Sequence, residues 1–243
     1  LGLNPKKTIF SKNNFDNTFE KIKKIKNGFW MGWLSYEAGS WIETSNRWQT
    51  SQISTLWIAS YDPIIKINLF KKEIFIEGSE LKDINRYKKL INTIDKKALK
   101  NNQKLEFDFS GINLNKTSQI FKENIKKIKN LISLGDIFQA NLTTKCEIKA
   151  KKNYCFLDIY LKIRNKLRAP FGGIIINNLE AQEGVLCTSP ERFLKIDKKG
   201  LVETRPIKGT RPRNKNKEKD ALNAIELITN EKDRAENIMI VDL

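Results

Sequence analysis

The sequence predicts an α+β fold in which short antiparallel strands are interrupted by helices. Runs of aromatic and β-branched residues are separated by polar or Pro-containing breaks, which is typical of antiparallel strands. Elsewhere apolar residues recur at spacings of three and four, which is typical of amphipathic helices. Strands and helices do not alternate regularly and no G-x-G-x-x-G loop is present, which argues against a nucleotide-binding doubly wound sheet.

The first half of the chain contains a helix, four strands and a second helix. Apolar residues at spacings of three and four predict a helix over residues 14–26, and Gly28 ends it. A polar stretch around residues 100–104 is the best candidate for a linker. The other elements predicted here are strands at 29–36, 55–61, 64–70 and 73–77 and a lysine-rich helix at about 80–97.

The second half contains a stronger helical pattern. Phe121, Ile125 and Ile128 fall on one face of a helix predicted over residues 117–134, and Gly135 stops it. The remaining predictions are strands at 137–148, 171–177, 184–188, 193–196 and 201–204 and helices at about 154–167 and 231–241. No internal repeat is present.

The composition is that of a globular chain with a sizeable core. The chain has 243 residues, of which 40% are hydrophobic and 30% charged, and a mean hydropathy of −0.50. These values exclude collagen, a coiled coil and wholesale disorder. The longest apolar stretches are far shorter than the roughly 20 residues of a membrane-spanning helix, and no signal segment opens the chain. We therefore expect a cytoplasmic protein with no membrane partner.

Two residue types restrict the possible chemistry. The sequence has no histidine, which excludes Ser-His-Asp and Cys-His nucleophiles and His-ligated zinc. Cys146, Cys155 and Cys187 are odd in number and lack C-x-x-C spacing, so we expect buried free thiols. The remaining candidates for catalytic groups are carboxylates, lysine, tyrosine and a metal ion acquired from solution.

The formal net charge of +17 invites a nucleic-acid hypothesis, because clustered Lys and Arg bind phosphate backbones. The lysines, however, are scattered through almost every segment, together with many Asn and Ile. This distribution indicates a compositional bias on solvated faces, and we expect no specific nucleic-acid partner.

Gln139 lies in a stretch that is richer in polar residues than strand packing requires. Gly135 and Asp136 suit a helix-to-strand turn, after which alternation places Ile137, Gln139 and Asn141 on one side of the strand. Gln139 therefore either pairs with backbone or lines a pocket.

Glu191 follows a Ser-Pro turn directly and precedes a strand. Proline restricts its own φ and disfavours helix in the preceding residue, so the carboxylate is held by a stiff backbone. A carboxylate held in this way can act as a general acid or base. The simpler interpretation is an ion pair with Arg192 or a nearby lysine.

Lys208 projects from a loop enclosed by Pro206 and Pro212. Gly209 and Thr210 offer N–H groups and a hydroxyl to a carboxylate, and the loop also carries arginines at 205, 211 and 213. If these arginines stay close, they disfavour the ammonium form and leave an amine nucleophile. The alternative is an exposed basic turn.

Glu236 is the candidate metal ligand. On a helix over 231–241, Asp233, Glu236 and Ile240 share a face, which makes Glu236 a plausible inward carboxylate for a hard cation such as Mg²⁺. One carboxylate is a weak metal site, so further oxygens must come from water, substrate or elsewhere in the protein.

Taken together, these stretches resemble the chorismate-utilising enzymes. The resemblance covers most of the chain after about residue 117, with a looser match in GFWMGWLSYE at 28–37. It implies two large, mostly antiparallel sheets flanked by helices. It also implies one chorismate-binding domain over 1–243, incomplete at both ends, with residues 1–110 as its N-terminal part and 111–243 as the first part of the catalytic core. The motifs that carry it are GDIFQANLT at 135–143, SPERF at 189–193, RPIKGTRPR at 205–213 and EKDRAENIMIVDL at 231–243.

One position discriminates within the family. Anthranilate synthases and the isochorismate and salicylate enzymes typically have Ala in the PIxGT loop, whereas enzymes of the aminodeoxychorismate synthase component I type have Lys, as Lys208 is here. Water-adding relatives also tend to have a lysine base where this chain has Gln139. The resemblance therefore implies amination of chorismate to 4-amino-4-deoxychorismate, toward 4-aminobenzoate and folate.

The resemblance also implies the roles of the site residues. Lys208 would attack the chorismate ring while Glu191 protonates the departing hydroxyl. Gly209 and Thr210 would hold a substrate carboxylate, Gln139 would contact substrate, and Glu236 would bind Mg²⁺.

Ammonia would come from a separate glutamine amidotransferase subunit, because a chain without histidine cannot carry the Cys-His chemistry. Family members continue past residue 243, so we expect the 243-residue chain by itself to be inactive. The alternatives are anthranilate synthase component I and a non-catalytic basic binding module.

Overall fold

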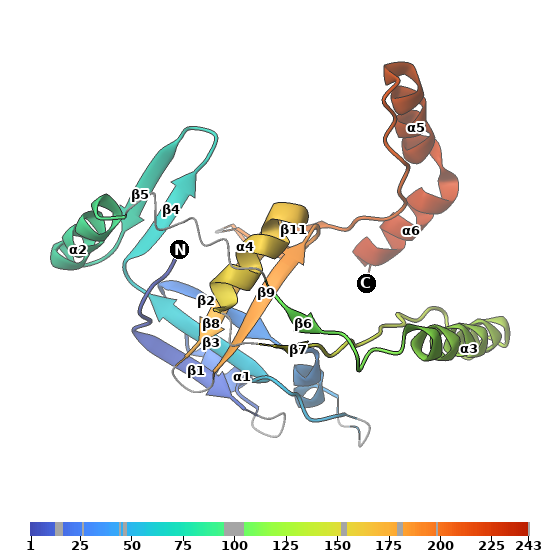
Figure 1. Cartoon of the computed structure of the whole chain (residues 1–243), viewed down its shortest axis with the longest axis horizontal. Helices are drawn as coiled ribbons and strands as arrows, with labels where there is room; N and C mark the ends of the chain where they lie inside the picture. Colours follow the sequence, from blue (N-terminus) through green and yellow to red (C-terminus); the bar gives the residue numbers. More distant parts are fainter. Residues whose placement is uncertain are drawn as a thin grey trace. The chain divides into compact units, whose positions relative to one another are not determined.

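The computed structural model describes residues 1–12, 17–25, 27–43, 45, 48–94, 105–151, 155–178, 182–197 and 199–242 (Figure 1). The chain forms two compact units. Leu1–Leu99 and Tyr160–Leu243 make the first, and Lys100–Ile159 the second. The expected parts 1–110 and 111–243 are a different division, which stays a prediction.

A three-stranded antiparallel sheet forms the best-packed part of the first unit. Its strands are β1 (Lys7–Ser11), β2 (Phe29–Leu34) and β3 (Leu56–Tyr61), in the order β1-β3-β2. The strands at 29–36 and 55–61 are thereby confirmed, each one or two residues shorter than predicted. Strand β1 is not among the predicted elements, because a five-residue strand carries too little alternation to be recognised.

An aromatic core fills one face of this sheet. The rings of Trp33 and Trp57 stack with their centroids 5.2 Å apart, and Trp57 is 1% exposed. A Cβ at Gly32 would collide with the carbonyl of Trp57, so glycine lets the two strands approach here. Ile175 and Val185 of the next sheet pack against this core.

The other strands of the first unit form two-stranded antiparallel sheets. These are β4 (Ile64–Asn68) with β5 (Glu73–Glu77), β8 (Phe171–Asn177) with β9 (Glu183–Ser189), and β10 (Arg192–Ile196) with β11 (Val202–Arg205). All six coincide with predicted strands to within a few residues. They form hairpins because short turns connect strands that are adjacent in sequence.

Helices and a 3₁₀ turn complete the first unit. They are α1 (Phe19–Lys23), η1 (Tyr36–Trp41), α2 (Leu81–Asn92), α4 (Phe156–Lys166), which begins in the second unit, α5 (Lys217–Thr229) and α6 (Glu231–Asp242). Helix α1 is shorter than the predicted 14–26, of which residues 14–16 and 26 lie outside the described residues. Within the described residues, no helix has both the length and the apolar character needed to cross a membrane.

The second unit contains α3 (Leu114–Ser133) and a two-residue pairing of β6 (Phe107–Asp108) with β7 (Lys149–Ala150). Helix α3 confirms the prediction at 117–134. Gly135 adopts a φ of +80° and its N–H donates to the carbonyl of Ile132, which ends the helix as glycine commonly does.

Two expectations about strands need correction. Residues 137–148 form no strand, because their side chains are exposed or half-exposed and no sheet face buries the alternating pattern. The α+β class and the antiparallel pairing are confirmed, but the described residues form sheets of two or three strands and not two large ones. A sheet becomes larger only where a further strand pairs with its edge strand. Residues 137–148, predicted as such a strand, pair with none of the described sheets.

Candidate active site

The turn between β9 and β10 holds Glu191. The Ser189 hydroxyl donates to the backbone carbonyl of Glu191 at 3.0 Å, and the Glu191 N–H donates back to that hydroxyl oxygen at 3.2 Å. Pro190 lies between the two residues and restricts the backbone. The turn thus fixes the backbone of Glu191, as the sequence predicts.

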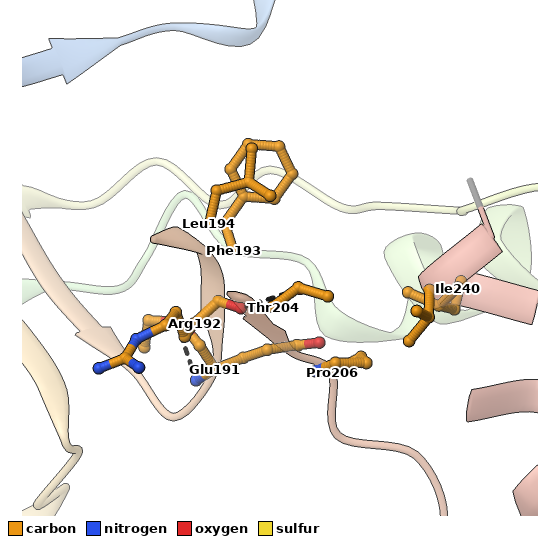
Figure 2. Close-up of a pocket in the computed structure, with 9 residues that line it drawn as sticks. Glu191, Arg192, Phe193, Leu194, Thr204, Pro206 and Ile240 are labelled. Atoms are coloured by element: carbon orange, nitrogen blue, oxygen red, sulfur yellow. Dashed lines mark hydrogen bonds between the residues drawn. The ribbon is translucent and has the colours of Figure 1, made fainter. Parts of the chain in front are cut away.

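The Glu191 carboxylate connects this turn to the loop that carries Lys208. Its Oε1 accepts the N–H of Ile207 at 3.1 Å. Figure 2 shows the carboxylate directed toward Pro206 and the Arg192 guanidinium directed away from it. The expected pairing of Glu191 with Arg192 is therefore not formed; Arg192 instead binds Glu203. Glu191 acts on the backbone one residue before the candidate nucleophile.

An open pocket of about 470 Å³ lies beside Glu191 (Figure 2). Apolar side chains from β10 and the end of α6 form much of its wall, and Glu191 and Thr204 add polar groups. The residues that line it are Ser189, Glu191, Arg192, Phe193, Leu194, Thr204, Pro206, Ile240 and Val241. The pocket thus brings the SPERF turn and the end of the EKDRAENIMIVDL helix together.

Lys208 lies against α6. Its Nζ is 3.9 Å from Oε1 of Glu236, and 27% of its side chain is exposed. The Asn237 side-chain amide donates to the carbonyl of Pro206 at 3.2 Å, which attaches the start of the loop to the same helix. Lys208 and Glu236, both of which are predicted to act at the site, are therefore neighbours. The alternative of an exposed basic turn does not describe Lys208, whose side chain is partly buried.

Gly209 meets two demands at once. Its φ is +61°, a conformation that L side chains rarely adopt, and a Cβ would lie 2.5 Å from Cγ of Asp233. Thr210 is exposed, and its carbonyl accepts a hydrogen bond from Arg211 at 3.0 Å. The Gly209 and Thr210 groups are placed next to Lys208, and their contact with a substrate carboxylate stays a prediction.

The arginines of the loop have acidic partners. Each binds carboxylates of its own, because a guanidinium fork forms strong paired hydrogen bonds with them. Their partners are Glu203 for Arg205, Glu226 and Asp233 for Arg211, and Asp220 for Arg213. The Glu236 carboxylate lies 3.9 Å from the Lys208 Nζ, and activation of the lysine by guanidinium neighbours stays a prediction.

These ion pairs shift the titration of their members. The hydrogen bond to Glu226 raises the pKa of Arg211, and the bond from Arg213 holds the pKa of Asp220 below its usual range. The loop is thus held by charges that stay ionised near neutral pH.

The described residues supply one carboxylate for a metal ion at this site. No group of three His, Cys, Asp or Glu side chains with suitable geometry occurs among the described residues. Glu236 is 43% exposed and contacts Lys208, whereas Asp233 on the same helix face is engaged by Arg211. Glu236 therefore fits as a single oxygen ligand of an open magnesium site, and it does not build one alone.

Gln139 belongs to the second unit, outside any strand, and is exposed. Its expected contact with the substrate stays a prediction. Conversely, sequence reasoning missed the roles of Asp233 and Asn237, which hold the Lys208 loop. The available signal was that Asp233 shares a helix face with Glu236.

A family model described as chorismate binding enzyme matches residues 4–243, which is nearly the whole chain. Among solved structures, anthranilate synthase component I from Streptococcus pneumoniae TIGR4 matches with a TM-score of 0.71 and 19% identity. The match covers 100% of this chain and 59% of that one. At this identity the likeness shows a shared fold.

Curated relatives are similar over parts of the chain. Aminodeoxychorismate synthase component 1 of Bacillus subtilis (strain 168) is 41% identical over 129 residues, 52% of this chain and 26% of the relative. The Escherichia coli (strain K12) protein of the same name is 36% identical over 129 residues, 53% and 27% of the two chains. A probable chloroplastic aminodeoxychorismate synthase of Oryza sativa subsp. japonica is 29% identical over 195 residues, 79% and 20%. The match thus spans about a quarter or less of each relative's length.

Proposed function

Because the chain belongs to the family of chorismate binding enzymes, we propose that it catalyses the amination of chorismate to 4-amino-4-deoxychorismate. This product leads to 4-aminobenzoate and folate. The observation that carries the proposal is the half-buried Lys208, which lies 3.9 Å from Glu236 in the loop that distinguishes this reaction within the family. Relatives named aminodeoxychorismate synthase support it.

Lys208 and Glu191 divide the chemistry between them. The amine of Lys208 forms a bond to ring carbon C2, the ring double bonds shift, and the C4–oxygen bond breaks while Glu191 donates the proton that lets water leave. Ammonia then forms a bond to C4, the double bonds return, and the bond between C2 and the lysine nitrogen breaks. The proximity of Glu191 to the backbone of the Lys208 loop supports this division.

Binding groups come from the same loop. The N–H of Gly209 and the hydroxyl of Thr210 bind one substrate carboxylate, and Gln139 is a further candidate contact with the substrate. Phe193, Leu194 and Ile240 form an apolar wall on one side of the pocket.

Glu236 would hold Mg²⁺ through one oxygen, and water or substrate oxygens would complete the coordination. When bound, the ion would supply positive charge opposite the substrate carboxylate. The partial exposure of Glu236 supports this role, since a substrate oxygen can reach the same ion.

The amine source is a partner protein. A glutamine amidotransferase subunit supplies ammonia, because the chain contains no histidine for glutamine hydrolysis of the Cys-His type. The complex works in the cytoplasm.

The second candidate, anthranilate synthase component I, has the support of the structural neighbour of that name. Its family pattern has Ala where this chain has Lys208, so a lysine-independent reaction would tolerate replacement of that residue. A non-catalytic basic module is the third candidate, and a salt-sensitive gel shift with RNA at physiological ionic strength would favour it.

We expect the 243-residue chain alone to produce no 4-amino-4-deoxychorismate from chorismate, ammonium and Mg²⁺. Two observations support this expectation: the described residues offer the metal a single carboxylate, and Phe193 beside the pocket is 83% exposed. Product detected by chromatography with the purified chain would contradict it.

Catalytic roles are therefore tested in a chimaera in which this chain replaces the homologous part of the Bacillus subtilis relative. Lys208→Ala is expected to lower kcat/KM for ammonia-dependent amination by about a thousandfold or more, because the nucleophile is lost. Arg213→Ala, a neighbouring cation whose side chain is 90% exposed, is the matched control and should retain activity. A Lys208→Ala chimaera with near-parental activity would overturn the proposal.

A further inference from the structure

We propose that Arg211 and Asp233 are positioning residues that fix how the Lys208 loop lies on α6. The inference deepens the proposed function, because it names the groups that hold the reacting amine in place. Neither residue touches the pocket described above, so both act through the loop and not on the substrate.

Arg211 connects the loop to two different helices. Its Nε donates to Glu226 of α5 at 2.9 Å, and an Nη lies 3.1 Å from Oδ2 of Asp233 on α6. The other Nη donates to the carbonyl of Thr210 at 3.0 Å, within the loop itself. One planar guanidinium thus joins three segments, which a lysine with its single ammonium head could not do in the same geometry.

Asp233 is the part of α6 on which the loop rests. Its backbone N–H donates to the side chain of Asn230, which fixes the first turn of the helix. Its carboxylate fills the space where a Cβ of residue 209 would be. The side chains of Arg211 and Asp233 are 21% and 16% exposed, so solvent screens their attraction less than at an open surface.

The consequence for Lys208 follows from helix periodicity. Asp233 and Glu236 are three residues apart and lie on one face of α6, so the contact of Gly209 with Asp233 sets the place of Lys208 beside Glu236. Asn237 holds the carbonyl of Pro206 one turn further along. If the contact at Asp233 is lost, the loop keeps its hydrogen bond to α6 at Pro206 but loses the contact with α6 that follows Lys208.

Arg213 provides the contrast within the same loop. It pairs with Asp220 at the start of α5 at 2.8 Å, its side chain is 90% exposed, and among the described residues it forms no ion pair with α6. Both arginines therefore stabilise the loop, but Arg211 alone of the two connects it to the helix that bears Glu236.

The test measures how fast Lys208 reacts with an acetylating reagent in the 243-residue chain, by peptide mass spectrometry and without chorismate. Arg211→Met and Asp233→Asn should raise its rate about threefold, because a side chain that is 27% exposed becomes fully accessible. Arg213→Met should leave the rate unchanged. Arg211→Lys, which keeps the charge, should fall between Arg211→Met and the parent.

The internal reference is Lys66, which is far from the loop in sequence. Its side chain is 44% exposed and forms an ion pair with Glu77. A general loss of structure would raise labelling at Lys66 as well as at Lys208, whereas a positioning role moves Lys208 alone. If Arg211→Met unfolds the chain, the labelling rates of Lys208 and Lys66 in the isosteric variant Asp233→Asn test the inference instead.

Unchanged labelling of Lys208 in Asp233→Asn, or an equal rise at both lysines, would overturn the inference. Because no chorismate is present, this outcome is distinct from failure of the proposed function, which the Lys208→Ala chimaera tests.

Discussion

Two parts of the first unit are held together by different forces. In the sheet β1-β3-β2, aromatic and aliphatic side chains are removed from water, with Trp57 1% and Ala59 0% exposed. Around the loop at 205–213 and helices α5 and α6, large apolar residues such as Leu222 and Ile228 stay exposed, and the contacts are ion pairs and side-chain hydrogen bonds. Apolar packing stabilises the first part, whereas ion pairs orient the loop relative to α5 and α6 in the second.

This difference agrees with what each part does. Packing energy is non-directional and scales with buried area, so it suits a scaffold. Hydrogen-bonded charges have specific geometry, so they suit a loop that, in the proposed function, holds the Lys208 amine in a fixed orientation. As a consequence, the stability of the second part should depend on salt and pH more strongly than the stability of the first.

The largest predicted effect concerns the aromatic core. Trp57→Ala should lower the free energy of unfolding by about 3–5 kcal/mol, because it removes a buried ring and leaves a cavity beside Trp33. Denaturant unfolding followed by circular dichroism measures it. Phe193→Ala, at a side chain 83% exposed, should change the same quantity by less than about 0.5 kcal/mol. Similar losses in the two variants would contradict a scaffold held by apolar burial.

The next effect separates backbone strain from crowding. Gly209→Ala and Gly200→Ala both place a side chain at positive φ, which costs about 1–2 kcal/mol. At Gly200 nothing lies within 4 Å of the added Cβ, whereas at Gly209 the Asp233 carboxylate must move. Gly209→Ala should therefore destabilise the chain more than Gly200→Ala. Equal unfolding free energies would mean that Asp233 does not press on the loop.

Salt should distinguish the two parts directly. Raising NaCl to about 1 M shortens the screening length to roughly 3 Å, so the exposed ion pair of Arg213 with Asp220 weakens first. Amide exchange of α5 should speed up, while exchange in β3 should not. Exchange that speeds up equally in both elements would argue against a charge-held C-terminal part.

The smallest effect is a pH dependence at Asp220. The bonds from Arg213 and from the N–H of Asn214 lower its pKa in the folded chain. Its stabilising contribution is therefore complete above the ordinary Asp pKa of about 4 and is lost as the pH falls through the lower folded value. Asp220→Asn should remove this acid-induced loosening of α5 in exchange measurements between pH 5 and 3 (about the ordinary carboxyl range). An unchanged pH profile in the variant would contradict the assignment.

How far the sequence could predict this molecule depends on the range of the interactions. Hairpins such as β4-β5 and the helix stop at Gly135 follow from local periodicity and from the conformational freedom of glycine. The prediction at 137–148 failed because alternation alone cannot show whether a sheet is there to bury one face. Helix α5 was missed because its apolar residues, Leu222 and Ile225 among them, follow a run of charges and face solvent.

The site shows the same limit. Glu191, Lys208 and Glu236 could be found from their motifs, since each is fixed by its own turn, loop or helix face. The partners of Arg211 could not, because Glu226 and Asp233 lie on two different helices, α5 and α6, whose approach to the loop depends on tertiary structure. The candidate site residues could therefore be chosen from the sequence, whereas the ion pairs around them are seen only in the structure.

The most direct measurement of the central claim is protection of one amine by the substrate. In the chimaeric enzyme with Mg²⁺, chorismate at saturating concentration should suppress acetylation of Lys208 severalfold and leave Lys66 unaffected. Labelling of Lys208 that stays constant as chorismate is added would contradict a reaction at this side chain.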